Sequence, residues 1–165
     1  MAAAHAAWRQ GARLVEIPVQ GEVGWRAAAA VLEAARAEGR SVGVGTVLEA
    51  AQVERAAALG AAFCVSPGLD DDVALACAER GLPHLPGVAT PTEISRAVRM
   101  GYVWLKAFPA AELGPAWLRA MRGPFPHVRF VCTGGMTPAR WPEFRDAGAD
   151  AAALTRGWEG QVATV

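Results

Sequence analysis

The sequence predicts an α/β protein with a shortened (β/α)8 TIM barrel. Short apolar runs alternate with longer segments rich in Ala, Leu, Arg and Glu, and the runs recur about every 20 to 28 residues, which suits repeated βα units. No run is followed by the Gly-x-Gly-x-x-Gly turn of a dinucleotide-binding sheet, so a closed barrel is favoured over a doubly wound open sheet. The 165 residues suit a single domain, residues 1–165.

Seven apolar runs are predicted as strands, each preceded by a helix. They are Leu14–Val19, Ser41–Val47, Ala61–Pro67, Leu82–Val88, Tyr102–Pro109, Val128–Gly135 and Asp150–Leu154.

Two helices are marked by both of their ends. The segment from Leu48 to Leu59 is predicted to stop at Gly60. The segment 70–81, "DDDVALACAERG", opens with three acids at the positive end of the helix dipole and closes with Arg80.

Two later helices are predicted from Thr-Pro starts. In "TPTEISRAVRMG", Thr90 is the expected N-cap, Pro91 the first helical residue and Glu93 the partner in a capping box. The segment 137–148, "TPARWPEFRDAG", is predicted to start in the same way.

The predicted elements fall short of a full barrel. The chain opens on a helix, so we expect the first strand to be missing, and the tail "GQVATV" stands where the last helix would be. Barrels usually need about 200 residues or more. Three alternatives stay open: the tail seals the barrel, a neighbouring subunit seals it, or the given start is a truncation.

Charge and cysteine content exclude several function classes. Sixteen acidic and sixteen basic residues balance, which gives no field to attract nucleic acid or anionic membranes. Three widely spaced cysteines in apolar sequence read as reduced core thiols. No segment reaches the roughly twenty apolar residues of a membrane span. We therefore expect a cytoplasmic protein that binds neither nucleic acid nor membrane.

The three histidines do not predict a metal centre. His5, His84 and His127 share no ligand spacing with one another or with the cysteines. We expect no metal and no cofactor.

The fifth predicted strand holds the only lysine, Lys106, in a chain with fifteen arginines. Strand alternation puts Lys106 on a face with Trp104 and Phe108. If that face points inward, desolvation lowers the pKa of the amine and makes it a nucleophile able to form an imine with a carbonyl. The alternatives are a snorkelling lysine or an ion pair with Glu16.

Two further signals lie at predicted strand ends. Gly134 and Gly135, in "CTGGMTP", are able to offer two backbone N–H groups to an anion such as phosphate, or to form only a tight turn. Glu16 is a carboxylate in a mostly apolar strand and is suited to moving protons.

Several motifs in order resemble the 2-keto-3-deoxy-6-phosphogluconate (KDPG) aldolase family, class I aldolases that also cleave 4-hydroxy-2-oxoglutarate (KHG). They are "VEIPV", "VGVGTVLEAAQ", "GAAFCVSPG", "LPGVATPTEI", "LKAFPA", "GPFPHVRFVCTGGMTP" and "RGW", from about Gly11 to Trp158.

The resemblance implies a role for each matched residue. Lys106 would form the imine with pyruvate or the keto acid, and Glu16 would move protons. Thr46 would bind the pyruvate carboxylate, with Pro67 and Phe108 shaping the pocket. The distal end of the substrate would be bound by Thr133, Gly134 and Gly135.

This chain departs from the family pattern at two binding positions. Gln20 stands where phosphogluconate-type members have an arginine, and Gly157 replaces the serine of Gly-Gly-Ser-Trp, with Arg156 beside it. "VEIPVQ" and "LGPAWL" are similar to the phosphogalactonate branch, whereas "GPFPHVRFVCTGG" is similar to the gluconate type. Arg156 would either rebuild the anion site or block it.

We therefore predict a class I aldolase that cleaves a 2-keto-3-deoxy-6-phospho sugar acid or KHG to pyruvate and glyceraldehyde 3-phosphate or glyoxylate. The alternatives are a phosphogalactonate aldolase, a degenerate non-catalytic barrel, and a phosphate-binding isomerase that uses Glu16 as base. The resemblance also implies a homotrimer.

Overall fold

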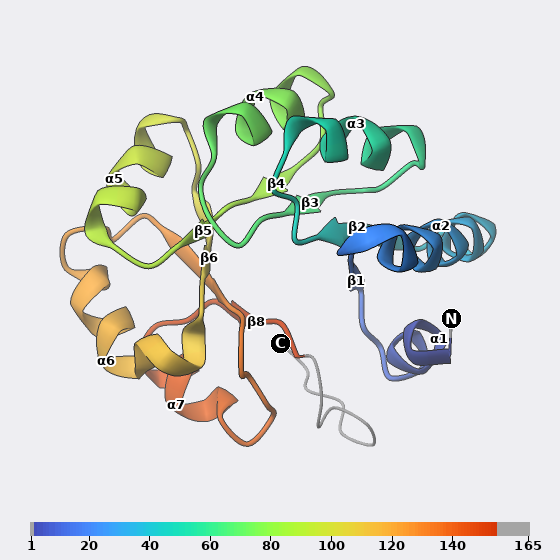
Figure 1. Ribbon diagram of the computed structural model, residues 1–165. Coiled ribbons are helices and arrows are strands. Elements are labelled where there is room, and N and C mark those ends of the chain that lie inside the picture. Colours follow the sequence, from blue (N-terminus) through green and yellow to red (C-terminus); the bar gives the residue numbers. More distant parts are fainter. Residues whose placement is uncertain (1, 155–165) are drawn as a thin grey trace. The chain divides into compact units, whose positions relative to one another are not determined.

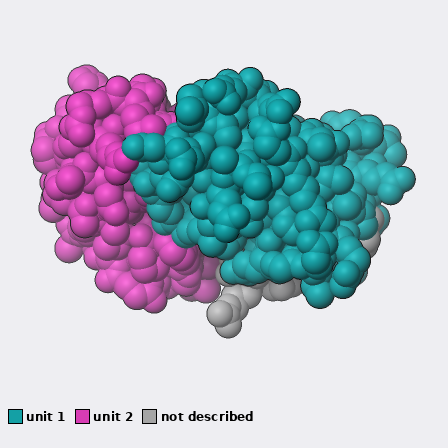
Figure 2. All heavy atoms as spheres, turned by 45° about the horizontal axis from the view of Figure 1, so that its top comes forward, with its two compact units in different colours: residues 1–85 teal, residues 86–165 magenta. Residues whose placement is uncertain are grey.

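A computed structural model describes residues 2–154 of the chain (Figure 1). It divides into two compact units, residues 1–85 and 86–165 (Figure 2). The single domain over residues 1–165 stays a prediction.

The first unit holds one parallel four-stranded sheet in the order β1-β2-β3-β4. Its elements in chain order are α1 (Ala2–Arg9), β1 (Leu14–Pro18), α2 (Gly21–Ala37), β2 (Ser41–Gly45), α3 (Ala50–Ala58), β3 (Cys64–Val65), α4 (Asp71–Glu79) and β4 (His84–Leu85). The alternation of helix and parallel strand makes this unit a series of βαβ repeats.

The core of the first unit forms between its helices and its sheet. Helix α2 packs on β1 and β2 and buries one face made of Trp25, Ala28, Val31, Leu32 and Ala35. These residues recur with the spacing of an amphipathic helix. Strand β2 meets them with Val42 and Val44, which are also buried. Burial of this face is the main stabilising contribution of α2.

The second unit holds another parallel four-stranded sheet, in the order β5-β6-β7-β8. Its elements are β5 (Gly87–Val88), α5 (Pro91–Arg99), β6 (Trp104–Ala107), α6 (Ala110–Arg122), β7 (Arg129–Cys132), α7 (Trp141–Asp146) and β8 (Ala151–Ala152). Helix α6 is kinked at Gly114, whose φ of 75° is left-handed, because Pro115 follows it and disfavours a helical conformation there.

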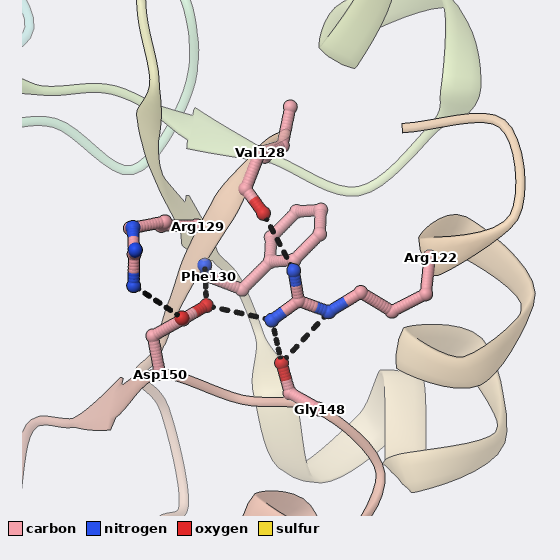
Figure 3. A network of polar contacts seen from close by, with 6 residues as sticks. All are labelled: Arg122, Val128, Arg129, Phe130, Gly148 and Asp150. Carbon is pink, nitrogen blue, oxygen red and sulfur yellow. Dashed lines mark hydrogen bonds and ion pairs between the residues drawn. The ribbon is translucent and has the colours of Figure 1, made fainter. Parts of the chain in front are cut away.

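One arginine joins α6 to the segments that precede β7 and β8 (Figure 3). The Arg122 side chain donates hydrogen bonds to the carbonyl oxygens of Gly148 and Val128, the latter at 2.8 Å, and pairs with Asp150 at 2.8 Å. Asp150 in turn accepts a hydrogen bond from the Phe130 backbone N–H at 2.9 Å. The guanidinium therefore supplies donors to carbonyl groups that lie outside the helices and strands.

The predicted strands are confirmed, with one interruption. Each of the seven apolar runs contains a strand, but the run Leu82–Val88 is divided at Pro86 into β4 and β5. Pro86 has no N–H to donate to a ladder, which explains the division. Within residues 2–154 the first element is α1 and the first strand is β1, as predicted. The tail that stands for the last helix lies outside the described residues.

The helix ends agree with the sequence at two of three predicted starts. Asp70 caps α4 by accepting from the Val73 N–H, and Thr90 and Glu93 form a complete capping box on α5. The third prediction was wrong, because residues 137–140 form a turn and α7 begins at Trp141. Pro142 lacks an N–H and is tolerated only in the first helical turn, so the helix cannot begin four residues earlier.

No helix within residues 2–154 is long and apolar enough to cross a membrane.

Candidate active site

Lys106 lies near the carboxyl end of β6 and is buried. Only 6% of its surface is exposed, and its Nζ is 4.7 Å from the ring centroid of Phe108. Trp104, predicted on the same face, is instead 45% exposed at the start of the strand, where the Arg129 guanidinium stacks on it. The ring of Phe108 is thus an apolar neighbour of the amine.

Thr133 lies on the same face of the sheet as Lys106. Lys106 is in register with Val131 of β7, and strand alternation brings Thr133 to the same face two residues later. Thr133 is 6% exposed, and its Oγ1 has no hydrogen-bond partner among the described atoms. A buried hydroxyl without a partner is costly in a protein interior, which marks this position as a candidate ligand contact.

The Gly134-Gly135 turn follows Thr133 and has a structural reason of its own. Both glycines have left-handed φ values, 88° and 68°, which side chains rarely adopt. A Cβ on Gly134 would come within 3.1 Å of the Phe108 ring, and one on Gly135 within 2.5 Å of the Ala111 Cβ. Close packing alone therefore requires glycine here.

The same turn is bonded to the start of α6. The Ala110 and Ala111 N–H groups donate to the carbonyl oxygens of Thr133 and Gly134, at 2.7 and 3.0 Å. These bonds occupy two of the free donors that a helix N-terminus presents. Any anion at this turn would meet the glycine amides and not these donors of α6.

Glu16 lies on β1 in the first unit and reaches along the neighbouring strand. Its Cα is in register with Gly43 of β2, whereas its outer side chain lies against Gly45, two residues farther on. The carboxylate is therefore carried toward the carboxyl end of β2. In parallel α/β proteins, ligands bind at this end of the strands.

Thr46 directly follows β2 in a strained conformation. Its φ is 62°, and it is the one residue other than glycine with positive φ within residues 2–154. A β-branched side chain in this region is a genuine outlier. Such outliers cluster at ligand sites, where the surrounding structure holds them in place.

Pro67 and Gln20 lie elsewhere in the first unit. Pro67 lines an open depression of about 190 Å³ whose other residues are Val47, Leu48, Gly68, Leu69 and Asp70. Gln20 is exposed and precedes α2 without capping it through its side chain.

The predicted site residues thus fall into two sets. Lys106, Phe108, Thr133, Gly134 and Gly135 belong to the second unit. Glu16, Gln20, Thr46 and Pro67 belong to the first unit. Arg156 and Gly157 lie outside the described residues.

Sequence reasoning missed a polar pair in the first unit. The Ser66 Oγ lies 2.9 Å from the His84 Nε2, and burial lowers the pKa of His84 to about 4. His84 stands in register with Cys64, two residues before Ser66, so parallel pairing of the two strands brings these side chains together. Only a prediction of strand register would have revealed the pair.

The three cysteines are free thiols, and the potential metal ligands do not cluster within the described part of the chain. Cys64, Cys77 and Cys132 are free and buried, as predicted, and burial raises the pKa of Cys132 to about 12. Within residues 2–154, no group of three His, Cys, Asp or Glu side chains is placed to hold a metal ion.

A family model described as KDPG and KHG aldolase matches residues 1–159. The chain belongs to this family. The resemblance seen in the ordered motifs is therefore confirmed over nearly the whole chain.

Two curated relatives illustrate the range of the family. A 2-dehydro-3-deoxy-phosphogluconate aldolase of Treponema pallidum is 46% identical over 96 residues, 58% of this chain and 46% of that protein. A probable 2-dehydro-3-deoxy-6-phosphogalactonate aldolase of Rhizobium meliloti is 35% identical over 139 residues, 84% of this chain and 65% of its own. The chain spans about half to two thirds of the length of such family members.

A solved family structure has the same fold. It is a KDPG aldolase from Legionella pneumophila with pyruvate captured at low pH as a covalent carbinolamine intermediate. The TM-score is 0.83 at 30% identity, over 90% of this chain and 72% of that one. The predicted fold class, an α/β protein of the TIM-barrel type, is confirmed by this similarity and by the parallel sheets of the chain.

Proposed function

We propose that the protein is a class I aldolase that cleaves a 2-keto-3-deoxy-6-phospho sugar acid or KHG to pyruvate and an aldehyde. The observation that carries the proposal is the burial of the only lysine near the end of a parallel strand, beside an aromatic ring. Family membership supports the same chemistry.

The proposed reaction runs through an imine on Lys106. The neutral amine adds to the substrate ketone to give a carbinolamine, which loses water to form the imine. Cleavage of the C3–C4 bond leaves its electron pair in an enamine and releases the aldehyde. Protonation of the enamine and hydrolysis then yield pyruvate and return the free amine. Glu16 is proposed to move the protons of these steps.

The other site residues are proposed to bind the two ends of the substrate. Thr46 and Gln20 would hold the carboxylate end, and Pro67 and Phe108 would bound the pocket. Thr133, Gly134, Gly135, Arg156 and Gly157 would meet the distal end. The unpaired Thr133 hydroxyl supports this assignment, because a ligand oxygen would supply the partner it lacks.

The imine is tested by trapping with borohydride in the presence of pyruvate. We expect a single covalent adduct on Lys106, with the mass of one pyruvic acid less one oxygen atom. Lys106→Arg is the matched control, since it keeps the cation but cannot form the imine, and the chain has no other lysine. A wild-type protein without an adduct would favour the non-catalytic alternative.

The substrate is tested separately, because the matched relatives include both phosphogluconate and phosphogalactonate enzymes. Pyruvate release from the gluconate-type, galactonate-type and unphosphorylated substrates is compared by kcat/KM. We expect weak dependence on phosphate if Arg156 points away from the substrate, since glycine stands at position 157 where the family has a serine. A large preference for a phosphorylated substrate would contradict this.

Assembly and location remain proposals as well. We propose a homotrimer in the cytoplasm, on the basis of the family resemblance and the reduced cysteines. Light scattering of the purified protein should give three times the mass of one chain.

A further inference from the structure

We propose that Gly45 is a positioning residue for the Glu16 carboxylate. Because Gly45 has no side chain, the carboxylate occupies the space that a Cβ at position 45 would fill. The inference rests on the proposed function, because Glu16 is the group expected to move protons. It concerns residues of the first unit only, and it assigns a task to a residue outside the predicted site.

The register of β1 and β2 sets up the contact. Glu16 is paired with Gly43, and Pro18 is paired with Gly45. Side chains at positions 43 and 45 would point to one face of the sheet, the face of Glu16. A side chain that leans along its strand from position 16 therefore crosses the backbone of Gly45.

The three atoms nearest to a Cβ placed on Gly45 all belong to Glu16. They are Oε1, with which the Cβ would overlap, Cδ at 2.5 Å and Cγ at 2.7 Å. Real Cβ atoms essentially never approach heavy atoms so closely, so the carboxylate would have to move. The contact involves the reacting end of Glu16 and not its stem alone.

The neighbouring glycine on the same face provides a contrast. A Cβ on Gly43 would instead overlap the ring of Phe63. The two glycines of β2 thus make room for different side chains, one aromatic and one acidic. Glycine weakens a strand interior, so its presence at position 45 calls for a close approach of this kind.

Displacement of the carboxylate would slow the reaction without removing the acid. A shift of about 1 Å in a catalytic group can cost roughly a hundredfold in rate. We expect Gly45→Ala to lower kcat for pyruvate release by about this factor and to change KM far less. The pH profile of kcat should also shift, since the carboxylate would sit in altered surroundings.

The experiment is a double-mutant cycle between positions 45 and 16, read by thermal melting and by kcat. Gly45→Ala should lower the Tm by about 3 °C, since the methyl group displaces the Glu16 side chain, which is flexible and is able to shift. In the Glu16→Ala background the same change should cost less than about 1 °C, because nothing remains to collide with the new methyl group. Gly43→Ala is the matched control and should cost the same in both backgrounds.

The outcomes separate this inference from the proposed function. Gly45 does not position the carboxylate if Gly45→Ala lowers the Tm equally with and without the Glu16 side chain. The same conclusion follows if the wild type is active and the Gly45→Ala variant has the same kcat. If the wild type releases no pyruvate and gives no borohydride adduct, the aldolase proposal fails. The melting cycle would still decide whether Gly45 holds Glu16.

Discussion

At the scale of single residues, the molecule places its only lysine side chain and the partly buried His84 where water is scarce. The 6% exposure of Lys106 contrasts with most of the arginines within residues 2–154, which are exposed. His84 is held against Ser66 in the first unit. A substitution of Lys106 is therefore predicted to lower activity, and protonation of His84 is predicted to lower stability.

Replacement of Lys106 by Arg should abolish pyruvate release while the chain stays folded. Arginine keeps the positive charge and most of the length, but its guanidinium does not form an imine with a ketone. We expect kcat to fall by about a thousandfold or more, as for the loss of a covalent nucleophile. Steady-state kinetics of pyruvate release and circular dichroism check this, and a folded variant that releases pyruvate at a near-normal rate would contradict the imine mechanism.

His84 should make the first unit sensitive to acid. Its pKa is lowered to about 4 by burial, so the folded chain keeps it neutral where the unfolded chain, with a pKa near 6.5, already binds a proton. Stability is therefore lost as the pH falls from about 6.5 to 4, by roughly 3 kcal/mol.

The prediction is checked with His84→Asn, which retains a polar side chain but does not titrate. Urea unfolding at pH 7 and at pH 4 should show a smaller loss of unfolding free energy for the variant than for the wild type. Equal losses would mean that His84 is protonated in the folded chain as easily as in the unfolded one.

At the scale of elements, the clearest constraint is the hydrogen-bond network around Arg122 (Figure 3). It joins the last turn of α6 to the backbone before β7 and before β8. Asp150 completes it by pairing with both Arg122 and Arg129. Elements far apart in sequence are thus fixed by one side chain that has several acceptors.

Arg122→Ala should destabilise the protein by about 1 to 3 kcal/mol, because two carbonyl groups lose this donor and the partly buried Asp150 loses one of its partners. Denaturant unfolding measures this loss. Arg119→Ala on the same helix is the control, since Arg119 is exposed, and it should change stability by less than about 0.5 kcal/mol. Similar effects of the two changes would show that the network adds little.

At the scale of the whole molecule, local sequence signals predicted the elements well. The apolar runs located every strand, and the Thr90–Glu93 capping box located the start of α5. The wrong start of α7 came from a competing proline, since Pro142 allows helix only from Trp141 onward. The start of a helix is predicted wrongly where two local signals conflict, as the Thr-Pro start at residues 137–138 and Pro142 do here.

The site was less accessible to sequence reasoning because it depends on register. Lys106, Glu16 and Thr133 were identified from their places in apolar strands and from the family motifs. The fit of Glu16 over Gly45 and the Ser66–His84 pair follow from which residues face each other across neighbouring strands. A one-residue change of register would alter every such contact.

The balanced charge of the chain predicts its behaviour in solution. With a formal net charge of zero at pH 7, molecules do not repel one another, so solubility should be lowest near neutral pH and should rise on either side. Turbidity of concentrated protein at pH 5, 7 and 9 checks this. A minimum far from neutrality would indicate several ionisable groups with strongly shifted pKa values.

The left-handed conformation of Thr46 has a consequence for anyone who wishes to make the enzyme more robust. Thr46→Gly would remove a steric penalty of about 1 kcal/mol and is an obvious first choice for thermostabilisation. The same exchange deletes the hydroxyl proposed to grip the substrate. Thermal stability and activity therefore have opposite requirements at this position. A screen that selects for heat resistance alone would favour variants that have lost activity.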